Sequence, residues 1–157
     1  MEKERTCCFT GNRIVGNDLN VETLRRCLRY LANEKNVTTF IAGGALGFDT
    51  IVAKEILKLK GELPHIQLHI YAPCKNQDAR WSFAQKLEYK SILKKADFVD
   101  IPECDYYEGC MKSRNFKMVD SSAFLVAYLN NMRSGTGQTY SYAKRCGLTI
   151  FNLAGKN

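Results

Sequence analysis

The sequence has no long hydrophobic run. No apolar segment approaches the ~20 residues that a membrane-spanning helix requires. The amino-terminal residues Met1 to Arg5 are mostly charged, and no apolar signal segment follows them before the polar stretch Thr10–Arg13. The sequence therefore predicts a cytoplasmic protein with no membrane partner.

Signals for disulfide pairing and for metal binding are also missing. The seven cysteines are an odd number, are scattered and never form a Cys-x-x-Cys pair, so we expect no disulfide framework. The two histidines, His65 and His69, have no third metal ligand near them in the sequence. Cys104 and Cys110 flank a polar loop, which leaves a metal or redox role there as a minor alternative. We predict no metal and no cofactor.

Acidic residues are too few to balance the basic ones. With 23 Lys and Arg against 16 Asp and Glu, the net charge is +7, which favours anionic partners such as nucleic acid or a small phosphorylated ligand. The basic residues are spread along the expected helices rather than gathered in one tract. Two interpretations stay open, solvated helix faces and a nucleic-acid footprint.

What the sequence does contain is a regular alternation of strand-like and helix-like segments. This alternation, in a chain of 157 residues, predicts a single α/β domain over residues 1–157, with a mostly parallel sheet and helices on both faces. The expected strands are Arg5–Phe9, Thr38–Ala42, Ile66–Tyr71, Asp97–Ile101, Ser122–Leu129 and Leu148–Leu153. The expected helices are one from Val21 to Asn36, then Thr50–Lys60, Trp81–Lys95, Cys110–Asp120 and Tyr140–Cys146.

Two glycine-rich turns each follow an expected strand and precede an expected helix. The first contains Gly43, Gly44 and Gly47, and the second contains Gly135 and Gly137. Glycine lets the backbone approach a ligand closely, and the start of a helix offers unpaired N–H donors to a phosphate. Because such turns lie along the carboxyl edge of a parallel sheet, we expect both to face one site. Close packing of helix on strand, with no ligand, is the alternative.

Two common nucleotide-binding motifs are absent. The dinucleotide fingerprint places Gly-x-Gly-x-x-Gly after the first strand and an acidic residue at the end of the next. Here the first glycine turn follows the second strand, and the strand after it ends in Tyr71–Cys74, without an acid. A Gly-x-x-x-x-Gly-Lys-Ser/Thr segment does not occur either, which excludes a P-loop NTPase.

Taken in order, several segments resemble the SLOG superfamily, the Rossmann-like group that includes DprA/SMF proteins and LOG-type phosphoribohydrolases. The resemblance is closest to the YpsA-like branch and extends over nearly the whole chain. The segments that carry it are Phe9–Arg13, Gly43–Asp49, Pro73–Cys74 with Trp81, Ser113–Asn115 with Met118–Asp120, and Ser134–Thr139.

This resemblance implies a Rossmann-like fold with a pocket for a nucleotide or a nucleotide-derived small molecule, in a sensor or sequestering module. It also implies a homo-oligomer, since SLOG relatives often pair. The ligand-binding residues that we predict are Thr10, Gly11, Asn12, Arg13, Gly43, Gly44, Ala45, Gly47, Asp49, Arg114, Ser134, Gly135, Thr136, Gly137, Gln138 and Thr139.

Two other functions stay open. LOG-type enzymes carry a glutamate just after the second glycine turn, whereas Gln138–Tyr142 contains no acid here. Asp49 and Asp120 remain as candidate acids or bases for a phosphoribohydrolase or nucleosidase, although a helix cap or a ribose contact is the preferred interpretation of Asp49. Single-stranded DNA binding, as in DprA-like relatives, is supported only by the positive charge.

Overall fold

The structure is a computed structural model that describes residues 2–154, and these residues form one α/β domain. All five strand pairings in its six-stranded sheet are parallel. The strands are β1 (Thr6–Gly11), β2 (Thr39–Ala42), β3 (Gln67–Tyr71), β4 (Phe98–Asp100), β5 (Phe124–Tyr128) and β6 (Thr149–Asn152). The helices are α1 (Val21–Glu34), α2 (Phe48–Glu62), α3 (Phe83–Lys95), α4 (Cys110–Asp120) and α5 (Gly135–Arg145), with a short 3₁₀ turn, η1, at Lys3–Arg5.

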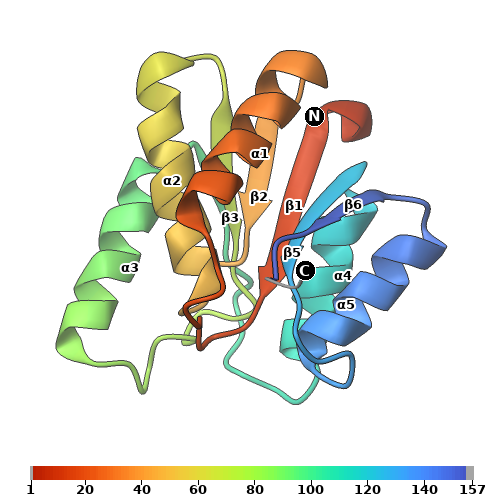
Figure 1. Ribbon diagram of the computed structural model, residues 1–157. Helices are drawn as coiled ribbons and strands as arrows, with labels where there is room; N and C mark the ends of the chain where they lie inside the picture. Colours follow the sequence, from red (N-terminus) through yellow and green to blue (C-terminus); the bar gives the residue numbers. More distant parts are fainter. Residues whose placement is uncertain (1, 155–157) are drawn as a thin grey trace.

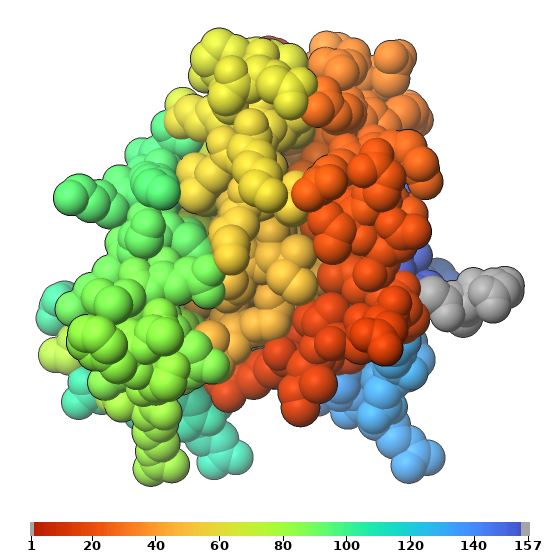
Figure 2. Space-filling view, turned by 60° about the vertical axis from the view of Figure 1, so that its left-hand side comes forward, coloured from red at the N-terminus to blue at the C-terminus, as the bar shows by residue number. Residues whose placement is uncertain are grey.

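The helices form a layer on each face of the sheet, as expected for a three-layer Rossmann-like domain (Figure 1). Neighbouring strand residues point to opposite faces, so Cys7 and Phe9 of β1 join the core beneath α1 and α2, and Cys8 joins the core beneath α4 and α5. Figure 2 shows α3 in green, α2 in yellow and α1 in orange-red side by side over the first face.

The order of the strands creates a switch point between β1 and β5. Across the sheet the order is β4-β3-β2-β1-β5-β6. From β1 the chain runs outward through β2, β3 and β4, and α4 then carries it back to β5 on the other side of β1. In open parallel sheets, ligands bind in the crevice outside the carboxyl ends of the strands at such a point. The end of β1 is therefore the place in this fold at which to look for a candidate site.

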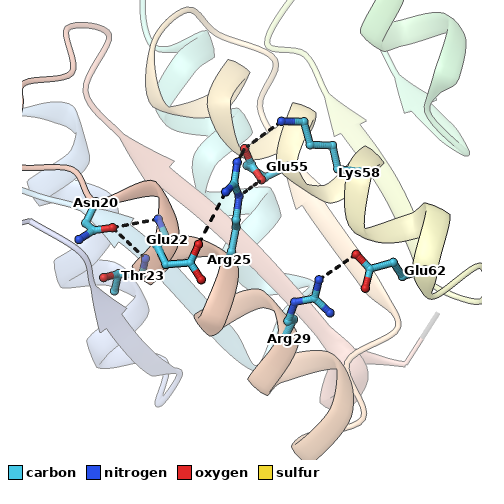
Figure 3. A network of polar contacts seen from close by, with 8 residues as sticks. All are labelled: Asn20, Glu22, Thr23, Arg25, Arg29, Glu55, Lys58 and Glu62. Carbon is cyan, nitrogen blue, oxygen red and sulfur yellow. Dashed lines mark hydrogen bonds and ion pairs between the residues drawn. The ribbon is translucent and has the colours of Figure 1, made fainter.

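Ion pairs tie α1 to α2 on the outer surface (Figure 3). Arg25 binds both side-chain oxygens of Glu55, at 2.8 and 3.2 Å, and Arg29 binds Glu62 at 2.8 Å. Asn20 caps the start of α1 by accepting the N–H groups of Glu22 and Thr23. The exposed Arg29–Glu62 pair contributes at most about 1 kcal/mol, whereas the Glu55 carboxylate is buried, with 9% of its side chain exposed.

Three helix starts differ from the predictions. Helix α2 begins at Phe48 rather than at Thr50. Helix α5 begins at Gly135 rather than at Tyr140, because Ser134 caps it by accepting the Gly137 N–H at 3.1 Å. The second glycine turn is thus the first turn of a helix. Helix α3 begins at Phe83 rather than at Trp81, because Ser82 and Gln85 form a capping box.

Gly47 offers a direct test of how the first glycine turn is packed. It has φ +83°, and a Cβ there would lie 2.1 Å from the Arg13 carbonyl oxygen. We expect Gly47→Ala to lower the free energy of unfolding by about 2–4 kcal/mol, from backbone strain and a clash that cannot relax. Urea denaturation measures the change.

Gly61 is the matched control, because it lies in α2 and a Cβ added there would have no atom within 4 Å of it. Gly61→Ala should raise the stability by about 0.5–1 kcal/mol, since alanine favours the helix. A Gly47→Ala variant as stable as the wild type would show that the two loops are not packed together as described.

Candidate functional site

A polar cavity of about 280 Å³ lies at the switch point, and we call it the switch-point cavity. The end of β1 and the first turns of α2, α4 and α5, with the residues just before α2 and α5, surround it. Its lining residues are Phe9, Thr10, Gly11, Asn12, Arg13, Ala45, Asp49, Met111, Arg114, Asn115, Ser134, Gly135 and Thr136. The two glycine segments, which are far apart in the sequence, therefore meet at one rim through Ala45 and Gly135.

The loop after β1 reaches this rim because it is packed tightly against the start of α2. The Phe48 N–H donates to the Asn12 carbonyl at 3.1 Å, and the Phe48 ring covers the Cα of Gly11 so closely that a Cβ there would lie 2.4 Å from it. The buried Tyr128 hydroxyl accepts the Gly16 N–H at 3.0 Å, further along the same loop. These contacts hold Asn12 and Arg13 at the mouth of the cavity.

Arg114 is a buried cation that joins α4 to the ends of two strands. Its Nη1 donates to the carbonyl oxygens of Gly43 at 2.7 Å and Tyr71 at 3.0 Å, and its Nε donates to Asn115 Oδ1 at 2.8 Å. Burial lowers the pKa of this guanidinium, and the nearby Asp49 carboxylate opposes that effect. Its Nη2 makes no hydrogen bond within residues 2–154, so this amino group has unused donors.

Asp49 lies in the first turn of α2 and is 7% exposed. Its Oδ2 accepts the Ala45 N–H at 3.3 Å, whereas its buried Oδ1 has no hydrogen-bond partner in the described part of the chain. Burial raises the pKa of Asp49 to about 6, and the Arg114 charge and the Ala45 N–H limit the rise. The carboxylate is thus a buried acceptor with only one of its two oxygens satisfied.

The start of α5 supplies backbone donors to the opposite side of the cavity. The first hydrogen bond between backbone groups of the helix runs from Gln138 N–H to the Ser134 carbonyl at 3.1 Å. The N–H groups of Gly135 and Thr136 precede it, so the helix provides no acceptor for them. The positive end of the helix dipole lies at the same place, and this combination suits a phosphate.

The charges around the cavity favour an anion. Arg13 is exposed at the mouth and forms no ion pair with the residues described. Arg114 adds a second positive charge from α4, and Asp49 is the one carboxylate among the lining residues. With three helix N-termini added to two arginines, the cavity has a positive balance.

A second hollow, of about 250 Å³, lies between α1 and α2 and is lined by the ion pairs of Figure 3. Its charged groups bind one another: Arg25 with Glu55, and Arg29 with Glu62. No residue that lines this hollow has a buried polar atom without a hydrogen-bond partner. No helix begins at its lining residues either. The switch-point cavity is therefore the better candidate site.

Ten of the sixteen predicted ligand-binding residues line the cavity, and the others lie behind it or away from it. Gly43 packs under Arg114 and Asp49, and Gly44 packs against Tyr89. The other predicted residues outside the lining are Gly47 and Gly137, which pack against backbone, the buried Thr139 and the exposed Gln138. Several of the glycines thus serve close packing, the alternative that the sequence left open.

Asp120 is not brought to the cavity. It is the last residue of α4, so it lies at the opposite end of that helix from Met111 and the lining residues. It is exposed there and accepts the Tyr142 hydroxyl at 2.6 Å. Because α4 runs antiparallel to the strands, this is the amino edge of the sheet, and Asp120 is too far away to act as an acid or base at this site.

Three lining residues lie outside the predicted set: Phe9, Met111 and Asn115. The sequence pattern places Phe9 in the core of a strand and Met111 among the apolar residues of a helix. For Met111, the position in the first turn of α4, just after Gly109, is the one sign that it lies at the rim of the cavity. Asn115 follows Arg114 directly and accepts its Nε hydrogen bond. The available signal was that Phe9 and Asn115 lie in the segments Phe9–Arg13 and Ser113–Asn115, which carry the family resemblance.

Metal ligands and membrane-spanning segments are not found in the part of the chain that the structure describes. Among residues 2–154, no group of three or more His, Cys, Asp or Glu side chains could hold a metal ion. No helix in that range is long and apolar enough to span a membrane.

A Rossmann-like domain with a polar cavity at its switch point defines the class of this protein, and sequence comparison gives the family. The chain belongs to the YpsA family of SLOG proteins, because the family model described as YspA SLOG family matches residues 17–146. It is 35% identical over 136 residues to the uncharacterized SPbeta prophage-derived protein YoqJ of Bacillus subtilis (strain 168), with 79% of this chain and 80% of that protein covered.

Other proteins similar to this chain are matched over only part of their length. A UPF0398 protein of Halalkalibacterium halodurans is 33% identical over 109 residues, which cover 68% of this chain and 58% of that protein. Among solved structures, DNA processing protein A from Streptococcus pneumoniae matches with a TM-score of 0.72 at 18% identity, over 98% of this chain and 52% of that one.

The same protein from Helicobacter pylori, described for its single-stranded DNA binding mode, matches with a TM-score of 0.68 at 18% identity, over 96% of this chain and 65% of that one. Likeness at this identity shows a shared fold. The chain therefore spans about half to two thirds of these longer proteins.

The half-satisfied Asp49 predicts a specific pH dependence of stability. Its pKa of about 6 in the folded protein exceeds the value of about 4 in an unfolded chain. The folded protein therefore keeps a proton that the unfolded chain releases, and this residue makes stability fall as pH rises from about 4 to about 6. We expect Asp49→Asn to be roughly 3 kcal/mol more stable than the wild type at about pH 7, with no difference below about pH 4.

Urea denaturation of both proteins at a series of pH values measures this difference directly. The comparison cancels the titration of all other carboxylates, since the two chains differ at one side chain. A stability difference that stays constant across the pH range would contradict the described environment of Asp49.

Proposed function

We propose that the switch-point cavity binds a nucleotide or a nucleotide-derived small molecule through its phosphate, as a sensor or sequestering module. The observation that carries this proposal is the convergence of three helix N-termini and two arginines on one cavity at the carboxyl edge of the sheet. The α5 side, with the free N–H groups of Gly135 and Thr136, is the side that suits the phosphate.

The cavity favours binding over hydrolysis. The segment in which LOG-type enzymes carry a glutamate, Gln138–Tyr142, lies inside α5 and contains no acid. Asp49 is the remaining carboxylate of the lining, and it is anchored through Ala45 N–H. A phosphoribohydrolase would have to use Asp49 alone, and release of free base from nucleoside monophosphates would reveal that activity.

A thermal-shift panel of inorganic phosphate, nucleotides, cyclic nucleotides and ADP-ribose tests the proposal. A ligand at 100 times its dissociation constant stabilises the folded protein by about 2.7 kcal/mol. We expect at least one phosphate-bearing compound to do so, and we expect Arg13→Ala to weaken its binding about tenfold or more, because a charge-assisted hydrogen bond is removed.

Arg26→Ala is the matched control. Arg26 is an exposed arginine of α1 that also forms no ion pair with the residues described, and it lies outside the cavity lining. Removal of its charge should leave the affinity nearly unchanged. Equal losses in the two variants would indicate a general charge effect, and a panel without any stabilising compound would refute the proposal.

A second candidate function is single-stranded DNA binding. It is favoured by the shared fold with DNA processing protein A and by the unpaired positive charge of one surface. We call this surface the α4–α5 face. Its residues are Lys112, Phe116, Tyr142, Lys144 and Arg145.

Its aromatic rings and cations lie next to one another. Phe116 and Tyr142 stack with ring centroids 4.0 Å apart, and the Lys112 and Arg145 cations lie 5.5 and 5.7 Å from those rings. Arg25 and Arg29 of α1 and the three lysines of α2 form ion pairs. Lys112, Lys144 and Arg145 form none within the described chain. Cations beside aromatic rings suit phosphates and bases of a single strand.

Fluorescence anisotropy with a labelled oligothymidylate tests this second candidate. If the α4–α5 face binds DNA, affinity should fall steeply with salt, and Lys144→Ala with Arg145→Ala should reduce the slope of log K against log salt by about 0.7 for each phosphate that is no longer bound. Lys94→Ala with Lys95→Ala on α3 is the control, since that adjacent exposed pair lies on the other face. Binding that is absent or independent of salt removes this candidate.

A further inference from the structure

Asp49 and Arg114 stand side by side in the lining of the switch-point cavity without binding each other directly. An oxygen of Asp49 and the Nη1 of Arg114 lie 2.7 and 2.6 Å from the point that a Cβ at Gly43 would occupy. No ion pair joins the two side chains within 4.0 Å. Each is instead held by backbone groups of the described chain: Asp49 by Ala45 N–H, and Arg114 by the Gly43 and Tyr71 carbonyls.

Each of these side chains keeps one hydrogen-bonding group unused. Asp49 Oδ1 is buried without a partner in the described chain, although an unsatisfied buried acceptor is costly and uncommon. Arg114 Nη2 makes no hydrogen bond with residues 2–154. On this side of the cavity the lining residues Asp49 and Arg114 therefore have an unused acceptor and an unused donor, whereas the α5 side presents donors only.

A phosphate alone does not fit this pattern. An ionised phosphate has acceptors and no donor, so it suits the Gly135 and Thr136 N–H groups but is repelled by the Asp49 carboxylate. What Asp49 Oδ1 requires is a group that donates a hydrogen bond. A hydroxyl donates to an acceptor and accepts from a donor, so it can bind Asp49 and Arg114 together.

We propose that Asp49 determines the specificity of the cavity by accepting a hydrogen bond from the 2- or 3-hydroxyl of the ligand's sugar. This inference rests on the proposed function and defines its ligand more narrowly, as a sugar phosphate with the phosphate toward α5 and the hydroxyl toward α2. Nucleotides inside a DNA strand have no free hydroxyl, so the same inference predicts that they do not bind in this cavity. Any DNA binding would then use another surface.

Isothermal titration calorimetry with four small ligands tests the inference on the wild-type protein. The ligands are ribose 5-phosphate, its 2-deoxy and 3-deoxy analogues, and methyl phosphate, which has no sugar hydroxyl. At about pH 7.5, where Asp49 is ionised, we expect ribose 5-phosphate to bind about 10- to 100-fold more tightly than methyl phosphate, as a hydrogen bond to a charged group provides. One of the deoxy analogues should lose this gain.

Asp49→Asn tests the residue itself, and Asp120→Asn, the same chemical change at the far end of α4, is its matched control. In Asp49→Asn the preference for ribose 5-phosphate should shrink to about threefold or less, while methyl phosphate binds as well as before or better. Asp120→Asn should keep the full preference. Circular dichroism verifies that both variants fold, and the wild-type ligand series does not depend on them.

The possible failures are distinguishable. If methyl phosphate binds the wild type as tightly as ribose 5-phosphate does, the hydroxyl contact is refuted and phosphate binding stands. The same conclusion follows if both deoxy analogues keep the full gain, or if Asp49→Asn retains the preference. If none of the four ligands binds, phosphate binding at this cavity fails, and the role of Asp49 fails with it.

Discussion

The site depends on one buried guanidinium. Burying an arginine costs several kcal/mol unless its donors are satisfied, and Arg114 is satisfied mainly by carbonyl oxygens of Gly43 and Tyr71, at the ends of two neighbouring strands. These bonds fix the start of α4 against the sheet edge. They require Gly43 to lack a side chain, because a Cβ there would lie 2.6 Å from the guanidinium.

This arrangement explains why Asp49 and Arg114 can both lie at the switch point without forming an ion pair with each other. If Arg114 paired with Asp49 directly, both would be neutralised and the cavity would lose its acceptor and its donor. Because the backbone carbonyls hold the arginine instead, the carboxylate remains partly unsatisfied and its pKa rises to about 6 through burial. The protein thus keeps a polar site at some cost in stability, as binding sites commonly do.

Most of the architecture follows from local patterns in the sequence. The alternation of elements predicts the parallel sheet, and the glycines after β2 and in the first turn of α5 predict where the edge of the site lies. Helix starts are harder to predict, because Gly135 looks like a turn residue until Ser134 is seen to cap it. Which glycines face a ligand and which only pack could not be predicted, since Gly47 is buried by the Arg13 backbone from a distant loop.

The roles of the site residues also could not be predicted from the sequence alone. Both Asp49 and Asp120 are candidates by their spacing, and only the direction of α4 separates them, by placing Asp120 at the other edge of the sheet. The orphan oxygen of Asp49 is likewise a tertiary property, since it depends on Arg114 binding carbonyl oxygens that lie 71 and 43 residues away in the sequence. Sequence patterns identify the edge, and long-range contacts decide the chemistry on it.

The most direct measurement of anion binding at the switch point is an amide NMR titration of the isotope-labelled protein with inorganic phosphate. We expect the largest saturable shifts at the N–H groups of Gly135, Thr136 and Met111, around the cavity. Saturable shifts confined to the hollow between α1 and α2, around Arg25 and Arg29, would contradict the assignment of this cavity as the binding site. The absence of any saturable shift would contradict it as well.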